Sequence, residues 1–229
     1  MLPAIIKRTL RHLPERLILC VARRFVLGPI RLFVFLQSRA QADELRIKTA
    51  AALGLIEAHS SNCYSRVCRF IPRILIFGGH AYTAVYVSEL GLCDVSRRYA
   101  LAETTTPSWL AMTLVHEATH GYLESRGFVY EEDRREQIEE ICVRTEIALA
   151  RRLPEGAELV AEAEAQLKIP SDYWKPEAFV QRDIEHLKKC GVPRWMVSSL
   201  ERRKARLAQP LLSPRGQHLL SPRGQQGKE

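Results

Sequence analysis

Residues 104–127 read TTTPSWLAMTLVHEATHGYLESRG, and this stretch decides the fold of the chain. The threonines before Pro107 predict the start of a helix, because a threonine side chain can cap the first turn and proline favours the first helical position. Gly127 predicts the end of the helix. The apolar residues between these ends fall on one broad arc: Trp109, Leu110, Leu114, Ala118 and Tyr122. The sequence therefore predicts a helix that is buried on nearly all of its circumference.

This helix carries the motif His116-Glu117-Ala118-Thr119-His120. Two histidines four positions apart lie one helical turn apart on the same face, so both imidazoles can bind one metal ion. Glu117 projects beside them. Since buried ionisable groups are unfavourable unless something binds them, we interpret the motif as a Zn²⁺ site, with His116 and His120 as ligands and Glu117 as the general base.

A catalytic zinc site usually has a third protein ligand, and the next helix offers candidates. The apolar positions of residues 134–153 repeat at helical spacing. Glu139 and Glu146 border this apolar stripe, whereas Glu136 and Glu140 point further outward. We predict Glu139 as the third ligand and Glu146 as a partner that holds a histidine or an arginine behind it.

The H-E-x-x-H helix, followed by a glutamate on the next helix, resembles the gluzincin class of zinc metallopeptidases. Residues 139–154 are also similar to the glutamate-bearing helix of small, uncharacterised bacterial H-E-x-x-H proteins. The resemblance covers about residues 104–154 and implies a third ligand on the second helix. Glu139 lies 19 residues beyond His120 and Glu140 lies 20 beyond it. Spacing leaves both open, and burial favours Glu139.

The motif and the resemblance predict a zinc-dependent hydrolase, a metallopeptidase that cleaves amide bonds in a peptide or protein substrate through a metal-activated water. Tyr130, Arg134 and Arg135 are candidate donors to the developing oxyanion, and the sequence does not choose among them. The alternative function is a non-catalytic metal-binding module that its basic ends dock to a membrane surface or a protein partner.

Residues 17–36 are apolar but do not predict a membrane span, because Arg23, Arg24 and Arg31 interrupt them and Gly28-Pro29 breaks a helix. Taken as an amphipathic helix, the segment has its arginines on one side and a wide apolar face on the other. That pattern suits peripheral membrane contact through residues 1–36, docking on a partner, or docking on the domain itself. We therefore treat residues 1–40 as a basic amphipathic N-terminal segment.

The remaining chain predicts an α+β fold, mainly helical, with a small sheet packed beside the zinc helix. A helix is expected over residues 40–59, and strands are expected over 71–77, 82–87 and 95–104. Residues 99–104 are a candidate edge strand for an extended substrate. Helices are expected over 157–167, 176–190 and 193–207. The metallopeptidase-like domain thus spans residues 41–208, and residues 209–229, with an eight-residue repeat, predict a disordered basic tail.

Charge and cysteine usage narrow the class of protein. The net charge is +8, but residues 1–40 hold eight Lys or Arg against one acidic residue and residues 201–229 hold seven against two, so the middle is acidic at −4. With the basic residues at the ends and no nucleic-acid motif, we expect no nucleic-acid partner. The six cysteines lack a C-x-x-C pair, which predicts reduced thiols and a cytoplasmic protein, with the membrane-peripheral alternative above.

Overall fold

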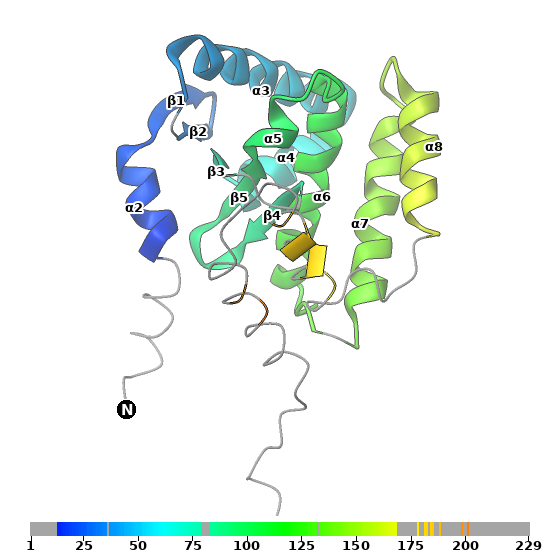
Figure 1. Ribbon diagram of the computed structural model, residues 1–229. Coiled ribbons are helices and arrows are strands. Elements are labelled where there is room, and N and C mark those ends of the chain that lie inside the picture. The colour runs from blue at the N-terminus through cyan, green and yellow to red at the C-terminus, as the bar shows by residue number, and fades with distance from the viewer. Residues whose placement is uncertain are drawn as a thin grey trace, which may run out of the picture. The chain divides into compact units, whose positions relative to one another are not determined.

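The computed structural model describes residues 13–35, 37–78, 83–131, 133–168 and a few single positions between 178 and 201, and it contains a five-stranded mixed sheet (Figure 1). The strands stand in the order β1-β2-β3-β5-β4. β2, β3 and β5 run parallel, while β1 and β4 are antiparallel edge strands. The strands are β1 Arg23–Leu27, β2 Ile30–Val34, β3 Arg73–Phe77, β4 Ala84–Val87 and β5 Leu92–Ser96.

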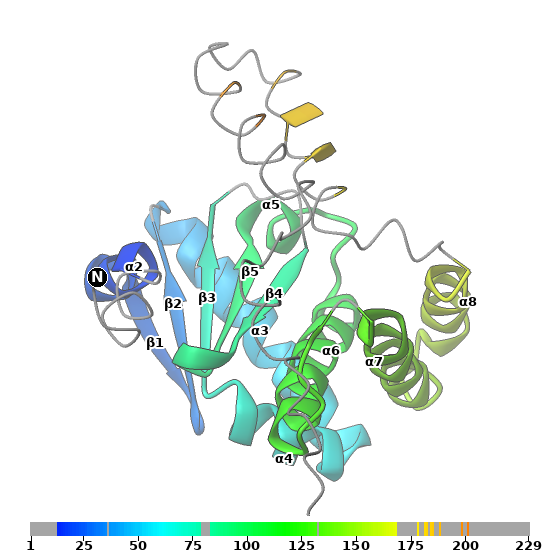
Figure 2. The same ribbon diagram turned by 90° about the horizontal axis from the view of Figure 1, so that it is seen from below.

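Helices outnumber strands among the described residues, and the mainly helical α+β class predicted from the sequence is confirmed. The helices are α2 Leu13–Val21, α3 Arg39–His59, α4 Ser61–Phe70, α5 Arg97–Ala100, α6 Pro107–Ser125, α7 Arg135–Ala150 and α8 Gly156–Gln166, with a 3₁₀ turn η1 at Ser88–Leu90. Figure 2 shows α6, α7 and α8 following one another beyond the β4 edge of the sheet.

The two faces of the sheet bury different clusters. Side chains of β2, β3 and β5 form the main core with α3, α4 and α6, for example Leu32, Ile74 and Val95 against Leu45 and Leu114. On the other face, α2 packs against a smaller cluster formed by Phe33, Leu75, Leu90 and Leu92. Strands that are apolar on both faces belong in the middle of a covered sheet, as β2, β3 and β5 do here. β4 is left at the edge, where it contacts α6.

The prediction of a single amphipathic helix over residues 17–36 is wrong. The helix ends at Val21, and β1 and β2 then form a hairpin in which Val26 pairs with Arg31 and Gly28 adopts φ 60°. The left-handed backbone at Gly28 is a conformation that glycine adopts readily, so it allows the tight reversal. In a strand, neighbouring side chains point to opposite faces, and residues 23–34 follow this two-residue repeat rather than a helical one. β2 also pairs with β3 in the sheet.

The strand predicted over residues 95–104 is also shorter than expected. β5 ends at Ser96 and Tyr99 lies in α5, where its hydroxyl is 2.9 Å from Thr113 Oγ1 on α6. Residues 99–104 therefore do not form an edge strand, and the edge beside α6 is β4. Residues 61–70, between the predicted helix and the first predicted strand, form helix α4, which Ser60 caps by accepting a hydrogen bond from the Cys63 amide.

The chain divides into two compact units, Met1–Phe179 and Val180–Glu229. The first unit includes the predicted N-terminal segment, residues 1–40, and most of the predicted domain, residues 41–208. The helices expected over 176–190 and 193–207 lie mostly outside the described residues, and the predicted tail lies wholly outside them. None of the helices in the described part of the chain is long and apolar enough to cross a lipid bilayer.

Candidate metal centre

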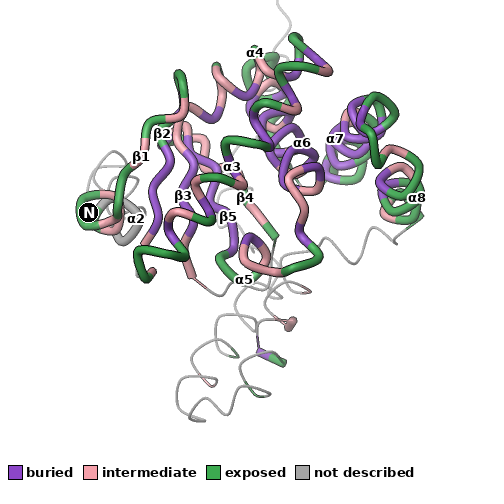
Figure 3. The backbone as a smooth tube through the Cα atoms, turned by 90° about the horizontal axis from the view of Figure 1, so that it is seen from above, coloured by how far each residue is buried: buried purple, intermediate pink, exposed green. Residues whose placement is uncertain are grey.

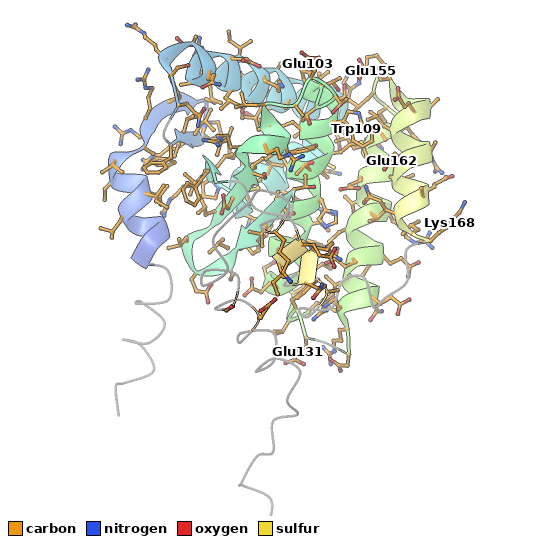
Figure 4. The ribbon with its side chains drawn as sticks, viewed as in Figure 1. Glu103, Trp109, Glu131, Glu155, Glu162 and Lys168 are labelled. Carbon is orange, nitrogen blue, oxygen red and sulfur yellow. The ribbon has the colours of Figure 1, made fainter. Side chains whose placement is uncertain are left out.

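Both ends of α6 form as the sequence predicts. The Thr106 side chain accepts a hydrogen bond from the Trp109 amide, and proline follows at the first helical position. At the other end, the Phe128 amide donates to the Leu123 carbonyl while Gly127 adopts φ 85°. This is the Schellman arrangement, which satisfies the last carbonyl groups of a helix. Glu103 before α6 and Glu131 after it mark the two ends of the helix in Figure 4.

α6 lies close to the edge strand because it carries a glycine at the crossing point. A Cβ atom on Gly121 would lie 2.7 Å from Phe70 Cβ on α4 and 3.0 Å from Tyr86 Cζ on β4. Only a residue without a side chain allows this approach. The helix is buried along most of its length, as Figure 3 shows. The close packing brings Glu117, one turn earlier, toward β4.

The two motif histidines face α7, which packs beside α6, and meet Glu139 there. His116 Nε2 lies 3.2 Å from Glu139 Oε2, and His120 Nε2 lies 3.7 Å from Glu139 Oε1. Their side chains are 14%, 15% and 11% exposed for His116, His120 and Glu139. Ligand atoms around a tetrahedral zinc ion, with bonds of about 2.0–2.1 Å, are about 3.3 Å apart. The contacts of Glu139 with the two histidines are close to this separation, although the group of three candidate ligand residues whose atoms all lie within 4.8 Å of one another is His116, His120 and Cys142.

Glu146 holds His116 from the opposite side of the ring. Its Oε1 atom lies 2.9 Å from His116 Nδ1, so the ring directs Nε2 toward Glu139. An acidic partner on the second nitrogen is the usual way in which proteins orient a histidine ligand and increase its basicity. The contact between Glu146 and a histidine is the one expected from the sequence.

The other two acidic residues of α7 do not face the histidines. Glu140 is half-exposed and binds Arg144, whose Nε and Nη2 atoms lie 2.8 and 2.6 Å from its Oε1. Glu136 is exposed. The structure thus brings Glu139 rather than Glu140 to the motif, although spacing along the sequence left both open.

Glu117 is buried, with 7% of the residue exposed. Burial raises the pKa of its carboxyl group to about 7, with Glu139 and Glu146 adding to the rise and His116 opposing it. A hydrogen bond with the Tyr86 backbone also lowers this pKa, so the Tyr86 amide must donate to the carboxylate and favour its charged form. Glu117 therefore lies between the histidine face of α6 and the edge strand.

The charges of the cluster are strongly coupled. Although burial lowers the pKa of His116, its contacts with Glu146 and Glu139 raise it well above the usual value. Burial and the neighbouring His116 charge lower the pKa of His120 to about 4. Burial raises the pKa of Glu139, but hydrogen bonding and charge from His116 outweigh it and bring the pKa to about 2. His120 is thus neutral and Glu139 ionised at neutral pH, which are the forms that bind a metal. The raised pKa of His116 instead favours its protonated form, so His116 would have to release a proton when it binds an ion.

Sequence reasoning missed one residue of the cluster, Cys142. Its Sγ atom belongs, with one nitrogen each of His116 and His120, to a group whose candidate ligand atoms all lie within 4.8 Å of one another. Burial raises the pKa of this thiol above its usual range. Helical spacing could have found it, because positions 139, 142 and 146 share one face of α7.

Tyr130 is the candidate oxyanion donor that contacts the cluster. Its hydroxyl donates to Glu139 Oε1 at 2.5 Å, and its ring packs edge-on to His120 with centroids 5.4 Å apart. The Arg135 guanidinium carbon lies 5.7 Å from the centre of the Tyr130 ring. Tyr130 is thus a candidate donor whose hydroxyl directly contacts a predicted ligand.

The donors at this interface are imidazole nitrogens, a carboxylate and a thiol, which are the groups that zinc binds in proteins. The residues present therefore fit the ion that the motif predicts. Comparison of the chain with protein-family models, with curated proteins and with solved structures gives no match.

Proposed function

We propose that this protein is a zinc-dependent hydrolase of the gluzincin type that cleaves amide bonds in peptides or proteins. One observation carries the proposal. Two imidazoles from one turn of α6 lie 3.2 and 3.7 Å from a single carboxylate of α7, beside the buried carboxyl group of Glu117.

His116, His120 and Glu139 would hold the ion. When bound, zinc supplies a Lewis acid that polarises a carbonyl group and makes a water molecule more acidic. Glu146 keeps the His116 ring in place through Nδ1, at 2.9 Å, and so leaves Nε2 free for the ion. The two helices supply rigid positions for all four side chains.

Glu117 is the general base. Its pKa of about 7 lets its carboxyl group accept and return a proton near neutral pH, and a nearby divalent cation would favour the charged carboxylate. The carboxylate accepts a proton from the attacking water and passes it to the nitrogen of the leaving amine. Its hydrogen bond with the Tyr86 amide orients it beside β4.

Substrate would lie along β4, the edge strand beside α6, rather than along residues 99–104. An edge strand offers unpaired backbone groups that can bind an extended peptide. Tyr130 is the side chain placed to donate a hydrogen bond to the oxyanion, since its hydroxyl already reaches the cluster through Glu139.

The second candidate function is a non-catalytic metal module that contacts an anionic membrane through its N-terminal region. The observation that favours it is the exposure of Leu17, Val21 and Val26, at 59%, 72% and 69%. They lie close in sequence to the exposed arginines Arg23, Arg24 and Arg31. Apolar side chains together with cationic ones suit the surface of an anionic bilayer.

The test combines metal analysis with hydrolysis of a mixture of fluorogenic peptides. We expect about one zinc per chain in the wild type, because catalytic sites of this kind hold a single ion. The Glu117→Gln variant should keep the zinc and lose hydrolysis, whereas Glu140→Gln, on the exposed side of α7, should keep both. An active Glu117→Gln variant would exclude Glu117 as the base.

The same experiment separates the two functions. A His116→Ala/His120→Ala variant should lose the zinc, and unchanged zinc in that variant would exclude the proposed site. Zinc bound by the two histidines in a wild-type protein without any hydrolysis would favour the non-catalytic module.

A further inference from the structure

The interface between α6 and α7 presents one donor more than a catalytic zinc site uses. Catalytic sites keep three protein ligands and one open position, whereas structural sites are closed by four. His116, His120 and Glu139 already supply three donors. Cys142 is a fourth donor within reach of the same histidines.

Cys142 lies on the same face of α7 as the two glutamates that hold His116. Glu139 and Glu146 contact the Nε2 and Nδ1 atoms of the His116 ring, and position 142 lies one turn from each. The thiol is fully buried and its Sγ atom lies within 4.8 Å of a nitrogen of each histidine. The packing of two helices thus aims the sulfur into the cluster.

Cys142 also belongs to an apolar cluster that includes Leu123 and Ile138. A buried cysteine can be simply a small apolar side chain, and this cluster alone would need nothing more. The two histidines near its sulfur change that expectation, because imidazole nitrogens and a thiolate are common zinc donors. The apolar cluster would keep water away from a sulfur–metal bond.

We propose that Cys142 is the fourth ligand of the ion, so that the resting site is closed by two histidines, a carboxylate and a thiolate. This role of Cys142 depends on the proposed zinc site, and a fourth ligand would regulate that site by closing it in the resting state. On binding, the Sγ–H bond breaks, the proton leaves to solvent, and Sγ binds the ion. Hydrolysis then requires one of the four donors to leave, and the soft sulfur makes the site select zinc or cobalt over magnesium or manganese.

Cobalt substitution tests the proposal by absorption spectroscopy rather than by activity. The cobalt-loaded wild type should show a thiolate-to-cobalt charge-transfer band in the near ultraviolet, together with the visible bands of bound cobalt. Cys142→Ser should lose the near-ultraviolet band while it still binds cobalt. The control is Cys93→Ser, because Cys93 is equally buried, on β5, but lies outside the ligand group; this variant should keep the band.

X-ray absorption at the zinc edge gives the same answer without any substitution, in case a cysteine variant does not fold. The zinc-loaded wild type should show one sulfur neighbour at about 2.3 Å in addition to nitrogen and oxygen neighbours. Bound cobalt or zinc without a sulfur neighbour would overturn the role of Cys142 and leave the proposed function standing. A wild type that binds neither ion would overturn both.

Discussion

The α6–α7 interface and the N-terminal region both depart from the usual distribution of side chains, but in opposite ways. Where α6 meets α7 and β4, Glu117, Glu139 and Glu146 are buried, although glutamate normally lies at the surface, and the side chains of His116 and His120 are only 14% and 15% exposed. The N-terminal region, α2 with β1, instead exposes apolar side chains. The first departure is unfavourable in free energy unless the groups bind something, whereas the second is common in folded proteins.

The two regions also differ in the contacts that their side chains make. At the interface His116, His120, Glu139 and Glu146 contact one another, and His116 contacts two carboxylates. In the N-terminal region, Ile18 and Leu19 of α2 pack into the smaller core, so only the outward face of the helix carries exposed apolar residues. We conclude that buried, mutually directed ionisable groups indicate function more strongly than scattered exposed apolar residues do.

The largest effect is expected from removing Glu139, the proposed ligand on α7. Glu139→Ala should weaken zinc binding by more than about 100-fold, because loss of a direct ligand exceeds the loss caused by mutating outer partners. Glu140→Ala should leave zinc affinity unchanged, since Glu140 binds only Arg144 among the contacts observed for it. Competition with a chromophoric chelator measures both affinities. Equal zinc affinities for the two variants would show that Glu139, on the buried face of α7, contributes no more to zinc binding than Glu140 on the exposed face.

Metal removal should lower stability by an amount set by mass action. Free zinc at 100 times its Kd stabilises the native state by about 2.7 kcal/mol, if the unfolded chain does not bind it. A chelator should therefore lower the Tm of the wild type, as followed by circular dichroism. The His116→Ala/His120→Ala variant serves as the control and should not respond. A wild-type Tm that is unchanged by zinc and by the chelator would show that the buried cluster is stable without a bound ion.

A smaller effect is expected at the residue that orients His116. Glu146→Gln should weaken zinc binding by about 10- to 100-fold, because the amide is a weaker acceptor for the Nδ1 proton than the carboxylate. The same titration with Glu136→Gln, an exposed glutamate of α7, provides the matched control. If the Glu146 variant binds zinc as tightly as the wild type, His116 is oriented by packing and not by this contact.

The smallest effect on stability is expected in the N-terminal region. Val26→Ser should change the free energy of unfolding by no more than about 0.5 kcal/mol, as for most surface substitutions. Leu75→Ala, in the adjacent buried cluster, should lower it by about 2–5 kcal/mol. Urea unfolding measures both. A large loss for Val26→Ser would mean that its side chain has a partner.

Flotation with anionic vesicles tests the same surface for membrane contact. If the second candidate function holds, the Val26→Ser variant should bind the vesicles more weakly than the wild type, while neutral vesicles bind neither protein. If the wild-type protein does not float with anionic vesicles, peripheral membrane contact through this region is excluded.

Sequence reasoning located α6 and the α7 glutamate that contacts its histidines because local rules govern both. The Thr106 cap and the left-handed Gly127 depend on neighbours within a turn or two. Glu139 was preferred over Glu140 from helical periodicity, and it is the residue that faces the histidines. The same reasoning failed at residues 23–34, where three arginines matched a helical face although the segment forms two strands.

The amino-acid sequence alone determined that a buried, capped helix carries two histidines and a glutamate, and that the next helix offers a carboxylate. Only the tertiary structure decided that β1 and β2 join the sheet, that β4 rather than residues 99–104 is the edge beside α6, and that Cys142 joins the cluster. The reason is that caps and helical faces follow from short-range geometry. Strand partners and the meeting of two helices instead depend on contacts between residues far apart in the chain, which local patterns do not encode.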